Sequence, residues 1–272
     1  KVQIKDVNGT KVETTYTPTV TDVTITPKDK TSEGNLGKTQ TGTPEFEVSS
    51  PDVHITGYKL LNPTGDTPIE GTEYEDPEQG TYRINLATGQ VTFIPKPGFQ
   101  GEAKGIKVRA TDENGETADA KYTPTVNPFI VISINKETKN IQGLPQEETP
   151  TFTLPEDASN ATITSRKLVD PANPTNPPKD KVILDGKGTF TIDGNGKVTF
   201  TPEPAYTGDV PSITIKATIT VTNDKGESAT IDSEAHYKPV IVPLELEKSP
   251  VTTRNLQGLE QKGTPTFTPK TI

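Results

Sequence analysis

The sequence contains no cysteine, methionine or tryptophan in 272 residues, and only two histidines. Without cysteine the chain has no disulfide framework, no thiolate nucleophile and no cysteine metal site. Because methionine is absent, we interpret the chain as an internal part of a longer protein. No run of 18 apolar residues is present, and no charged and then apolar signal segment opens the chain. The sequence therefore predicts no membrane insertion.

Large apolar side chains are scarce as well. Ile, Val, Leu and Phe together account for 59 of the 272 residues, just above the ~20% below which chains usually remain disordered. Burial of so little apolar surface barely outweighs the entropy lost when the chain becomes ordered. We therefore expect thin cores, low stability for each folded part, and different stabilities for neighbouring parts.

Basic residues are outnumbered by acidic ones, 28 against 37, which gives a net charge of -9. A protein of this charge repels phosphate backbones and anionic lipid surfaces. Nucleic acid is therefore excluded as a partner. The charge also opposes association between sheet edges, so we expect a monomer.

Turn-forming and β-branched residues are what the sequence has in abundance. It contains 22 Gly, 26 Pro and 46 Thr. Gly and Pro at this frequency leave little room for an uninterrupted helix. Threonine is stiff at its first side-chain torsion and favours strands. This composition predicts an all-β protein.

Two unrelated landmarks recur along the chain with the same period. The sequence YTPTV at 16–20 returns at 122–126, and a degenerate copy, YKPVI, begins at 237. Thr-Pro-x-Phe begins at 43, 149 and 264, so both landmarks give intervals of 106 and 115 residues. A longer similarity joins 88–101 to 195–208. A fixed period of this kind indicates tandem repeats.

The period divides the chain into two full repeats and two partial ones. We expect full repeats at residues 24–128 and 129–243. We interpret residues 1–23 as the C-terminal end of a preceding repeat and residues 244–272 as the N-terminal start of a following one.

Alternating side chains and turn residues indicate how each repeat folds. In the second full repeat five apolar residues alternate with polar ones: Ile213, Ile215, Ala217, Ile219 and Val221. This pattern places every apolar side chain on one face of a strand. Shorter alternations occur in both full repeats: Val91 and Phe93; Val198 and Phe200; Ile106 and Val108; Ile130, Ile132 and Ile134. About seven short strands per ~100 residues, with Asn-Gly and similar turns between them, predict tandem immunoglobulin-like antiparallel β-sandwiches in an elongated array.

Several motifs resemble a known family, the CshA-type fibril repeats of large cell-wall-anchored adhesins from streptococci and related Gram-positive bacteria. The motifs are TGTP at 41–44, GTY at 80–82, ATD at 110–112, NG at 114–115, KLVDP at 167–171, GKVTFTP at 196–202 and the closing YTPTV. The resemblance covers nearly the whole chain. It implies a cell-surface, wall-anchored filament of neighbouring repeats that displays a separate N-terminal region, and it implies that this region, not the repeats, adheres to host glycoproteins.

Catalytic residues are hard to find in this sequence. The two histidines, His54 and His236, occupy different positions within their repeats, so no acid–base or metal ligand recurs. No Gly-x-Ser-x-Gly motif is present, and the acidic residues are scattered. We therefore expect no enzymatic activity, no cofactor, and no catalytic or metal-ligating residue.

A calcium site at Asp112, Glu113 and Asn114 is an alternative that the sequence leaves open. These side chains offer the oxygen ligands that hard cations prefer. The related positions read DVNG at 6–9 and NDKG at 223–226, so the charge is not maintained. A turn explains the same residues, because Asp and Asn hydrogen-bond their own backbone and Gly accepts positive φ.

A lysine–asparagine isopeptide cross-link is a second open alternative. Three asparagines recur in register, Asn35, Asn140 and Asn255, as do Lys59 and Lys167. No acid that could catalyse the condensation recurs with them, because Glu47 aligns with Thr153.

The sequence therefore favours a structural role. We expect a stalk or fibril-forming segment of a bacterial surface adhesin, without catalysis, that holds a separate ligand-binding domain away from the cell wall. The alternative is a binding module whose own repeats contact a host protein or glycan.

Overall fold

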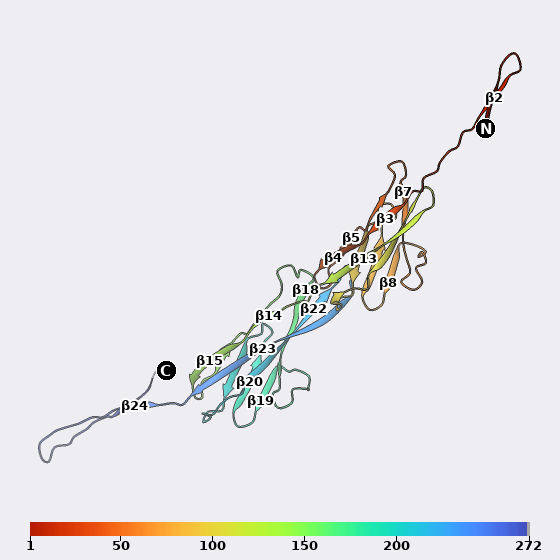
Figure 1. Ribbon diagram of the computed structural model, residues 1–272. Helices are drawn as coiled ribbons and strands as arrows, with labels where there is room; N and C mark the ends of the chain where they lie inside the picture. The colour runs from red at the N-terminus through yellow and green to blue at the C-terminus, as the bar shows by residue number, and fades with distance from the viewer. Residues whose placement is uncertain (271–272) are drawn as a thin grey trace. The chain divides into compact units, whose positions relative to one another are not determined.

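A computed structural model describes residues 1–270, which form β-strands joined by turns and contain no helix (Figure 1). Within this range no helix exists that could cross a membrane. The chain divides into two compact units. The first unit comprises 1–33, 40–93 and 102–125, and the second comprises 34–39, 94–101 and the chain from 126 onward. The prediction of an all-β fold is confirmed.

The first unit contains two larger sheets and two further strand pairs. One sheet has the strand order β5-β10-β9-β8; the other has the order β11-β13-β12-β7, with β4 pairing to β13. The strands are β1 (Val2–Lys5), β2 (Lys11–Thr14), β3 (Ile25–Lys28), β4 (Lys30–Gly34), β5 (Gln40–Gly42), β6 (Glu45–Val48), β7 (Ile55–Leu60), β8 (Glu73–Asp76), β9 (Gly80–Ile84), β10 (Val91–Pro95), β11 (Gly101–Glu102), β12 (Ile106–Asp112) and β13 (Thr117–Val126). Of the two pairs outside these sheets, β1-β2 is a hairpin, whereas β3-β6 is a two-stranded sheet whose strands are separated in sequence by β4 and β5.

The second unit repeats this plan. Its sheets have the orders β15-β23-β22-β18 and β16-β21-β20-β19, and its two-stranded ribbons are β14-β17 and β24-β25. The strands are β14 (Ile132–Ile134), β15 (Lys136–Ile141), β16 (Gln146–Glu148), β17 (Thr151–Thr153), β18 (Ala161–Val169), β19 (Lys181–Leu184), β20 (Gly188–Ile192), β21 (Val198–Pro202), β22 (Ile213–Thr222), β23 (Ser228–Val242), β24 (Leu246–Ser249) and β25 (Thr266–Pro269).

One strand pair of the second unit is not antiparallel. The second strand of this repeat, β15, runs parallel to β23, the strand that closes it, with Lys136 opposite Tyr237 and Ile141 opposite Val242. The other pairs of the two four-stranded sheets are antiparallel. The sequence predicted antiparallel sheets but contained no signal for this pairing, because alternation reports a strand's face and not its neighbour.

Each core lies between the two sheets of its unit. The five alternating apolar residues of β22 are all fully buried, as the sequence predicts. Aromatic rings meet on the facing sheet, with 4.6 Å between the centroids of Tyr82 and Phe93 and the same distance between Phe190 and Phe200. In the second unit Phe190 also reaches across to Tyr237 of the other sheet, at 6.2 Å. These contacts make each unit a two-layered β-sandwich.

The shorter alternations divide into two groups. Val91, Phe93, Val198, Phe200, Ile106 and Val108 are buried, as expected. Ile130, Ile132 and Ile134 are exposed, so the expectation of a buried face was wrong there. The reason is that β14 pairs only with the short β17 and belongs to neither layer of the sandwich.

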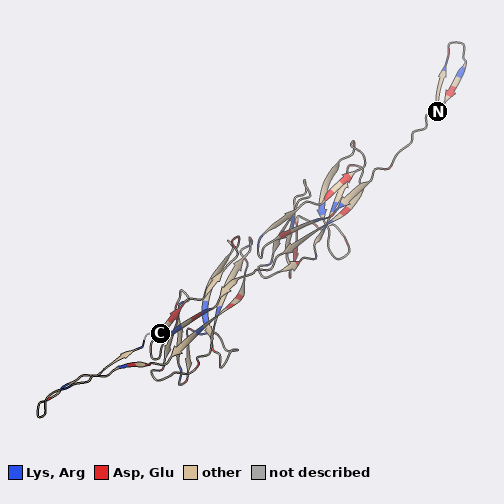
Figure 2. Cartoon of the chain, turned by 60° about the vertical axis from the view of Figure 1, so that its left-hand side comes forward, with Lys and Arg blue, Asp and Glu red and all other residues tan. Residues whose placement is uncertain are grey.

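Charged residues of both signs are interspersed along the strands of both units (Figure 2). In β22 and β23, for example, the amine of Lys216 lies 2.8 Å from the carboxylate of Asp232. Such pairs on a strand's outer face keep it solvated and contribute little stability.

Candidate functional site

A buried polar cluster joins three strands of the first unit. It consists of Ser32 on β4, Gln40 on β5 and Tyr122 on β13. The Ser32 hydroxyl donates to Gln40 Oε1 at 2.6 Å and lies 2.7 Å from the Tyr122 hydroxyl. Because serine has a single hydroxyl hydrogen, Tyr122 is the donor in the second bond. Gln40 Nε2 then donates to the carbonyl of Thr125, at 3.0 Å. The cluster therefore ties β4 and β13, the last strand of the repeat, to the facing sheet.

The second unit contains the same cluster, built from Thr138 on β15, Gln146 on β16 and Tyr237 on β23. Thr138 Oγ1 lies 2.6 Å from Gln146 Oε1 and 2.7 Å from the Tyr237 hydroxyl. Gln146 Nε2 donates to the carbonyl of Val240 at 3.0 Å. All three distances agree between the two units, so the cluster is a structural feature that both repeats share. We call these two groups of residues the polar clamps.

Burial explains why the clamps are well defined. Gln40, Gln146 and both tyrosines are buried. Burial raises the pKa of Tyr122 and of Tyr237, because the phenolate would lose its hydration, while the hydrogen bonds to Ser32 and Thr138 oppose this rise. The tyrosines are therefore neutral hydrogen-bond donors at physiological pH. In a low-dielectric core, removing one member of the clamp leaves the remaining polar groups without a hydrogen-bond partner, which lowers the stability of the fold.

Sequence reasoning found the clamp tyrosines only as parts of a landmark and missed their partners. Glutamine and hydroxyl residues do not stand out in a chain with 46 threonines. A signal was nevertheless present, because Ser32, Thr138 and Thr253 follow the same 106- and 115-residue intervals and each precedes a glutamine by eight positions. The third pair is hydrogen-bonded too, with 2.8 Å between Thr253 Oγ1 and Gln261 Oε1.

The residues considered for calcium form a turn. Asp112 Oδ1 accepts hydrogen bonds from the backbone N–H groups of Asn114, at 2.9 Å, and Glu116, at 2.8 Å. Glu113 Oε1 instead accepts from the backbone N–H of His54. Asp6 and Asn223 make the same pair of bonds in their own turns. No group of three or more potential metal-binding side chains occurs within residues 1–270.

The residues considered for an isopeptide bond lie apart from one another. The amide of Asn140 donates to the Pro145 carbonyl, as that of Asn255 does to Glu260. Asn35 lies in the loop between β4 and β5, where its carbonyl accepts from Lys38. Lys59 lies on β7, and Lys167 on β18 forms an ion pair with Asp180 at 2.6 Å. In the described part of the chain, no hydrogen bond joins a lysine amine to these asparagines.

Both histidines lie at exposed positions in different places. His54 precedes β7 and lies 3.6 Å from the Glu113 carboxylate. His236 is on β23, with Nδ1 3.1 Å from the Thr214 hydroxyl. The two rings therefore do not form a common site.

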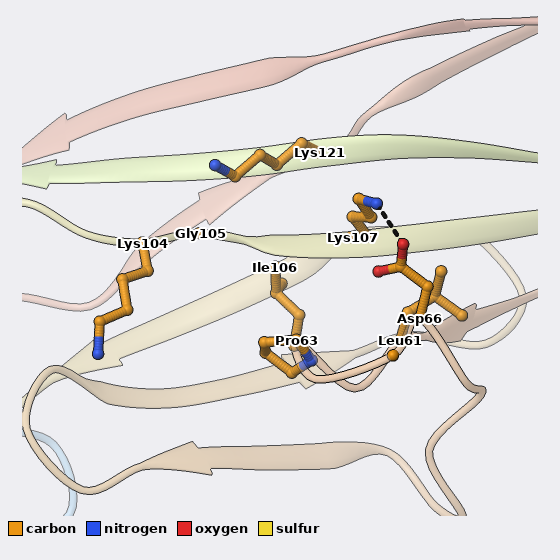
Figure 3. Close-up of a pocket in the computed structure, with 9 residues that line it drawn as sticks. Leu61, Pro63, Asp66, Lys104, Gly105, Ile106, Lys107 and Lys121 are labelled. Carbon is orange, nitrogen blue, oxygen red and sulfur yellow. Dashed lines mark hydrogen bonds and ion pairs between the residues drawn. The ribbon is translucent and has the colours of Figure 1, made fainter.

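A second candidate site is a pocket of about 330 Å³ in the first unit (Figure 3). Its apolar floor consists of exposed Pro63 and of Leu61 and Ile106, which are each only 1% exposed. Three lysines and one acid surround this floor: Lys104, Lys107, Lys121 and Asp66. Sequence patterns do not reveal this site, because Lys121 becomes a neighbour of Lys107 only through the pairing of β12 with β13.

The three lysines of the pocket differ in their partners. The amine of Lys107 lies 2.6 Å from Asp66, and that hydrogen bond raises the pKa of Lys107. The amine of Lys104 lies 3.5 Å from the carboxylates of Asp76 and Glu78. The negative charge of Asp76 is the main cause that raises the pKa of Lys104. Lys121 forms no ion pair with any described carboxylate. Of the three amines, that of Lys121 is therefore the one with no carboxylate partner among the described residues.

Comparisons with solved structures found similar folds at low sequence identity. Titin domains A168–A170 are 11% identical, with a TM-score of 0.31, over 85% of this chain and 71% of that one. Mouse cadherin-23 EC22–24 is 12% identical, with a TM-score of 0.28, over 81% of this chain and 66% of that one. The chain spans about half the length of the Sidekick-1 and protocadherin gamma B2 chains that it also matches. A comparison with curated proteins found no match.

The family comparison is more specific. The model of the surface adhesin CshA repetitive domain matches residues 22–126 and again residues 128–241. Two consecutive matches cover well over half of the chain, and both include one complete polar clamp. The chain belongs to the family of the surface adhesin CshA repetitive domain.

Proposed function

We propose that this chain is a load-bearing stalk segment of a cell-wall-anchored surface adhesin, which displays a separate ligand-binding region and catalyses no reaction. Full repeats at 24–128 and 129–243 would follow one another in an elongated array. The observation that carries this proposal is the parallel pairing of β15, which lies near the start of a repeat, with β23, which closes it, reinforced by a polar clamp.

The direction of the strands in the second unit favours resistance to pulling. Tension enters the repeat through β14, which pairs with the short β17, reaches the four-stranded sheet at the start of β15 and leaves the repeat at the end of β23. Because these strands run parallel over Lys136–Ile141 and Tyr237–Val242, tension would slide one strand along the other. The hydrogen bonds between them then share the load, whereas an antiparallel pair pulled from one end would open one bond at a time.

The polar clamp adds connections at the same place. Thr138 lies on β15 and Tyr237 on β23, so their hydrogen bond crosses the loaded strand pair. Gln146 lies on β16 of the facing sheet and is hydrogen-bonded to Thr138 of β15 and to the Val240 carbonyl of β23. It therefore connects both strands to that sheet. Sliding of β15 would therefore break buried hydrogen bonds in addition to those of the ladder.

The end segments support an array of more than two repeats. The β1-β2 turn at Asp6 has the hydrogen bonds of the turns at Asp112 and Asn223. The bond between Thr253 and Gln261 reproduces half of a clamp. We therefore assign residues 1–23 and 244–272 to flanking repeats.

Single-molecule stretching of the 272-residue chain tests the proposal. We expect two unfolding events, each releasing on the order of 300–400 Å of chain. The double variant Thr138→Val with Tyr237→Phe should lower the force of one event and leave the other unchanged. Equal forces in the variant and the original chain, or extension without distinct events, would refute a load-bearing role.

A further inference from the structure

We propose that the lysine-lined pocket of the first unit binds an anionic sugar residue, through a carboxylate or sulfate group held by Lys104, Lys107 and Lys121. This inference adds a binding activity to the repeat and does not depend on the stalk proposal. It rests on the pocket's shape, its charge, its backbone conformation and its restriction to one repeat.

The shape and lining suit a small ring that carries a charge. The cavity, about 330 Å³, lies at the lower end of the ~300–1,000 Å³ typical of small-molecule sites. Pro63 and Ile106 lie at its centre, and the lysines extend from the surrounding backbone (Figure 3). The C–H face of a sugar ring can pack on this apolar floor while its acidic group reaches the amines. No aromatic side chain lines the pocket among the described residues, so nothing there would stack on a nucleotide base.

The pocket gathers lysines within an acidic chain. Three lysines and one aspartate line it, whereas the whole chain carries -9. The amine of Lys107 lies 2.6 Å from the carboxylate of Asp66. The amine of Lys104 lies 3.5 Å from the carboxylates of Asp76 and Glu78. Lys121 has no ion-pair partner within residues 1–270. A ligand's anionic group would supply the charge-assisted hydrogen bonds that Lys121 lacks.

The pocket's rim has an uncommon backbone conformation. Asp66, with φ of 51°, is the one non-glycine residue with positive φ in the described chain. Its loop is closed by hydrogen bonds from Asp66 N–H to the Asn62 carbonyl, at 3.1 Å, and from Asn62 N–H to the Thr67 carbonyl, at 2.8 Å. The left-handed conformation is one that aspartate tolerates better than most residues. In this loop the Asp66 carboxylate lies beside the Lys107 amine.

The second repeat lacks this chemistry although it shares the fold. Ile106 pairs with Tyr122 as Ile213 pairs with Tyr237. By this register Lys107 corresponds to Thr214 and Lys121 to His236, while Lys104 corresponds to Pro211. The sandwich therefore does not need these lysines, and a separate role accounts for them.

Matched charged and neutral sugars provide the test. The isotope-labelled 272-residue chain is titrated with sialyllactose against lactose, and with glucuronic acid against glucose, and amide shifts and binding heats are recorded. We expect an acidic sugar to bind and its neutral counterpart not to bind, with shifts centred on Leu61, Ile106 and Lys107. Added NaCl should weaken the binding.

Two variants locate the binding. Lys121→Gln should reduce affinity about tenfold, the effect of losing one charge-assisted hydrogen bond. Lys139→Gln, which makes the same change of charge on β15 of the second unit, should leave affinity unchanged. Lys104→Gln repeats the test if Lys121→Gln does not fold. A sulfated sugar and inorganic phosphate complete the series of probes.

Several results would overturn the proposal. Equal binding of neutral and acidic sugars would show that charge is not recognised. Unchanged affinity in both pocket variants would place binding elsewhere. If inorganic phosphate bound as tightly as every acidic sugar, the pocket would hold an adventitious ion only. Absence of binding by all acidic sugars would also refute it.

Discussion

The buried tyrosines of this fold differ in whether their hydroxyl groups are hydrogen-bonded. Tyr122 and Tyr237 donate within the polar clamps. Tyr82 on β9 is equally buried, but its hydroxyl makes no hydrogen bond of full geometry in the described protein and only approaches the backbone of Gly105. The corresponding residue of the second repeat is Phe190, which keeps the same 4.6 Å ring contact without a hydroxyl. A buried hydroxyl with no partner costs roughly 1–3 kcal/mol.

Tyr82→Phe should therefore stabilise the first unit by about 1 kcal/mol. The substitution removes the unmatched hydroxyl and keeps the ring that packs on Phe93. Urea unfolding of the original chain and the variant measures the change in midpoint. Tyr122→Phe is the matched control and should destabilise, because its hydroxyl is hydrogen-bonded to Ser32. A loss of stability in Tyr82→Phe would mean that the hydroxyl has a partner after all.

At the scale of the strand, period and alternation predicted much of what forms. The alternation in β22 identified its buried face, and the Asn-Gly signals identified hairpin turns such as that of β12 and β13. Pairing between distant strands was beyond the sequence, because β15 and β23 are about 100 residues apart and carry no pairing signal. Ile132 shows a further limit, since alternation cannot tell whether a second layer covers a face.

The candidate sites were less accessible to sequence reasoning than the fold. Gln40 and Gln146 are buried through hydrogen bonds rather than apolar character, so hydropathy does not reveal them. Lys104, Lys107 and Lys121 meet only because a loop, β12 and β13 lie side by side. The clamp could have been found by aligning the repeats and looking for polar residues that recur. Ser32 and Gln40, which are eight positions apart, are such a pair.

The packing of β5 against β13 gives a prediction at the same scale. A Cβ added at Gly42 would lie 2.2 Å from Tyr122 Cε2 and 3.1 Å from Lys30 Cγ. Tyr122 cannot move aside without breaking its bond to Ser32. Gly42→Ala should therefore destabilise the first unit by about 1–3 kcal/mol, the usual cost of overpacking.

Gly57 on β7 provides the control for this prediction. A Cβ there would meet no atom within 4 Å. Gly57→Ala should leave the midpoint of chemical unfolding unchanged or raise it slightly, because alanine restricts the unfolded chain. If both glycine substitutions had the same effect, the contact with Tyr122 would not be the cause.

For the whole molecule, the thin cores imply modest and unequal stabilities. The β22-β23 hairpin pairs ten residues on each strand, whereas β12-β13 pairs six. The longer hairpin buries five alternating apolar residues on β22 alone. We therefore expect the second unit to melt above the first, and both to melt below about 90 °C, the start of the hyperstable range.

Calorimetry of the 272-residue chain, with one variant in each unit, assigns the transitions. Gly42→Ala should lower the first transition. Gly188→Ala should lower the second, because a Cβ on Gly188 would lie 2.4 Å from the Thr201 carbonyl oxygen. A single transition above about 90 °C would contradict the expectation drawn from composition.

The clamp tyrosines also give the whole chain a dependence on alkaline pH. Burial raises the pKa of Tyr122 and Tyr237 in the folded state. The stability that the two residues contribute is therefore fully present below the pKa of unfolded tyrosine, about 10. Above that pH the unfolded chain loses these protons first, so the free energy of unfolding falls as pH rises further.

The Tyr122→Phe and Tyr237→Phe double variant checks this dependence. It should be less stable than the original chain at pH 7, because the hydrogen bonds to Ser32 and Thr138 are lost. Between about pH 9 and 11 its stability should fall less steeply, because two of the buried phenols no longer titrate. Urea midpoints across this range measure both effects, and Tyr16→Phe, at a tyrosine that is 75% exposed, should change neither. Parallel loss of stability in the double variant and the original chain would show that the clamps do not govern alkaline unfolding, and the fall would then have to come from Tyr82 or from the lysines.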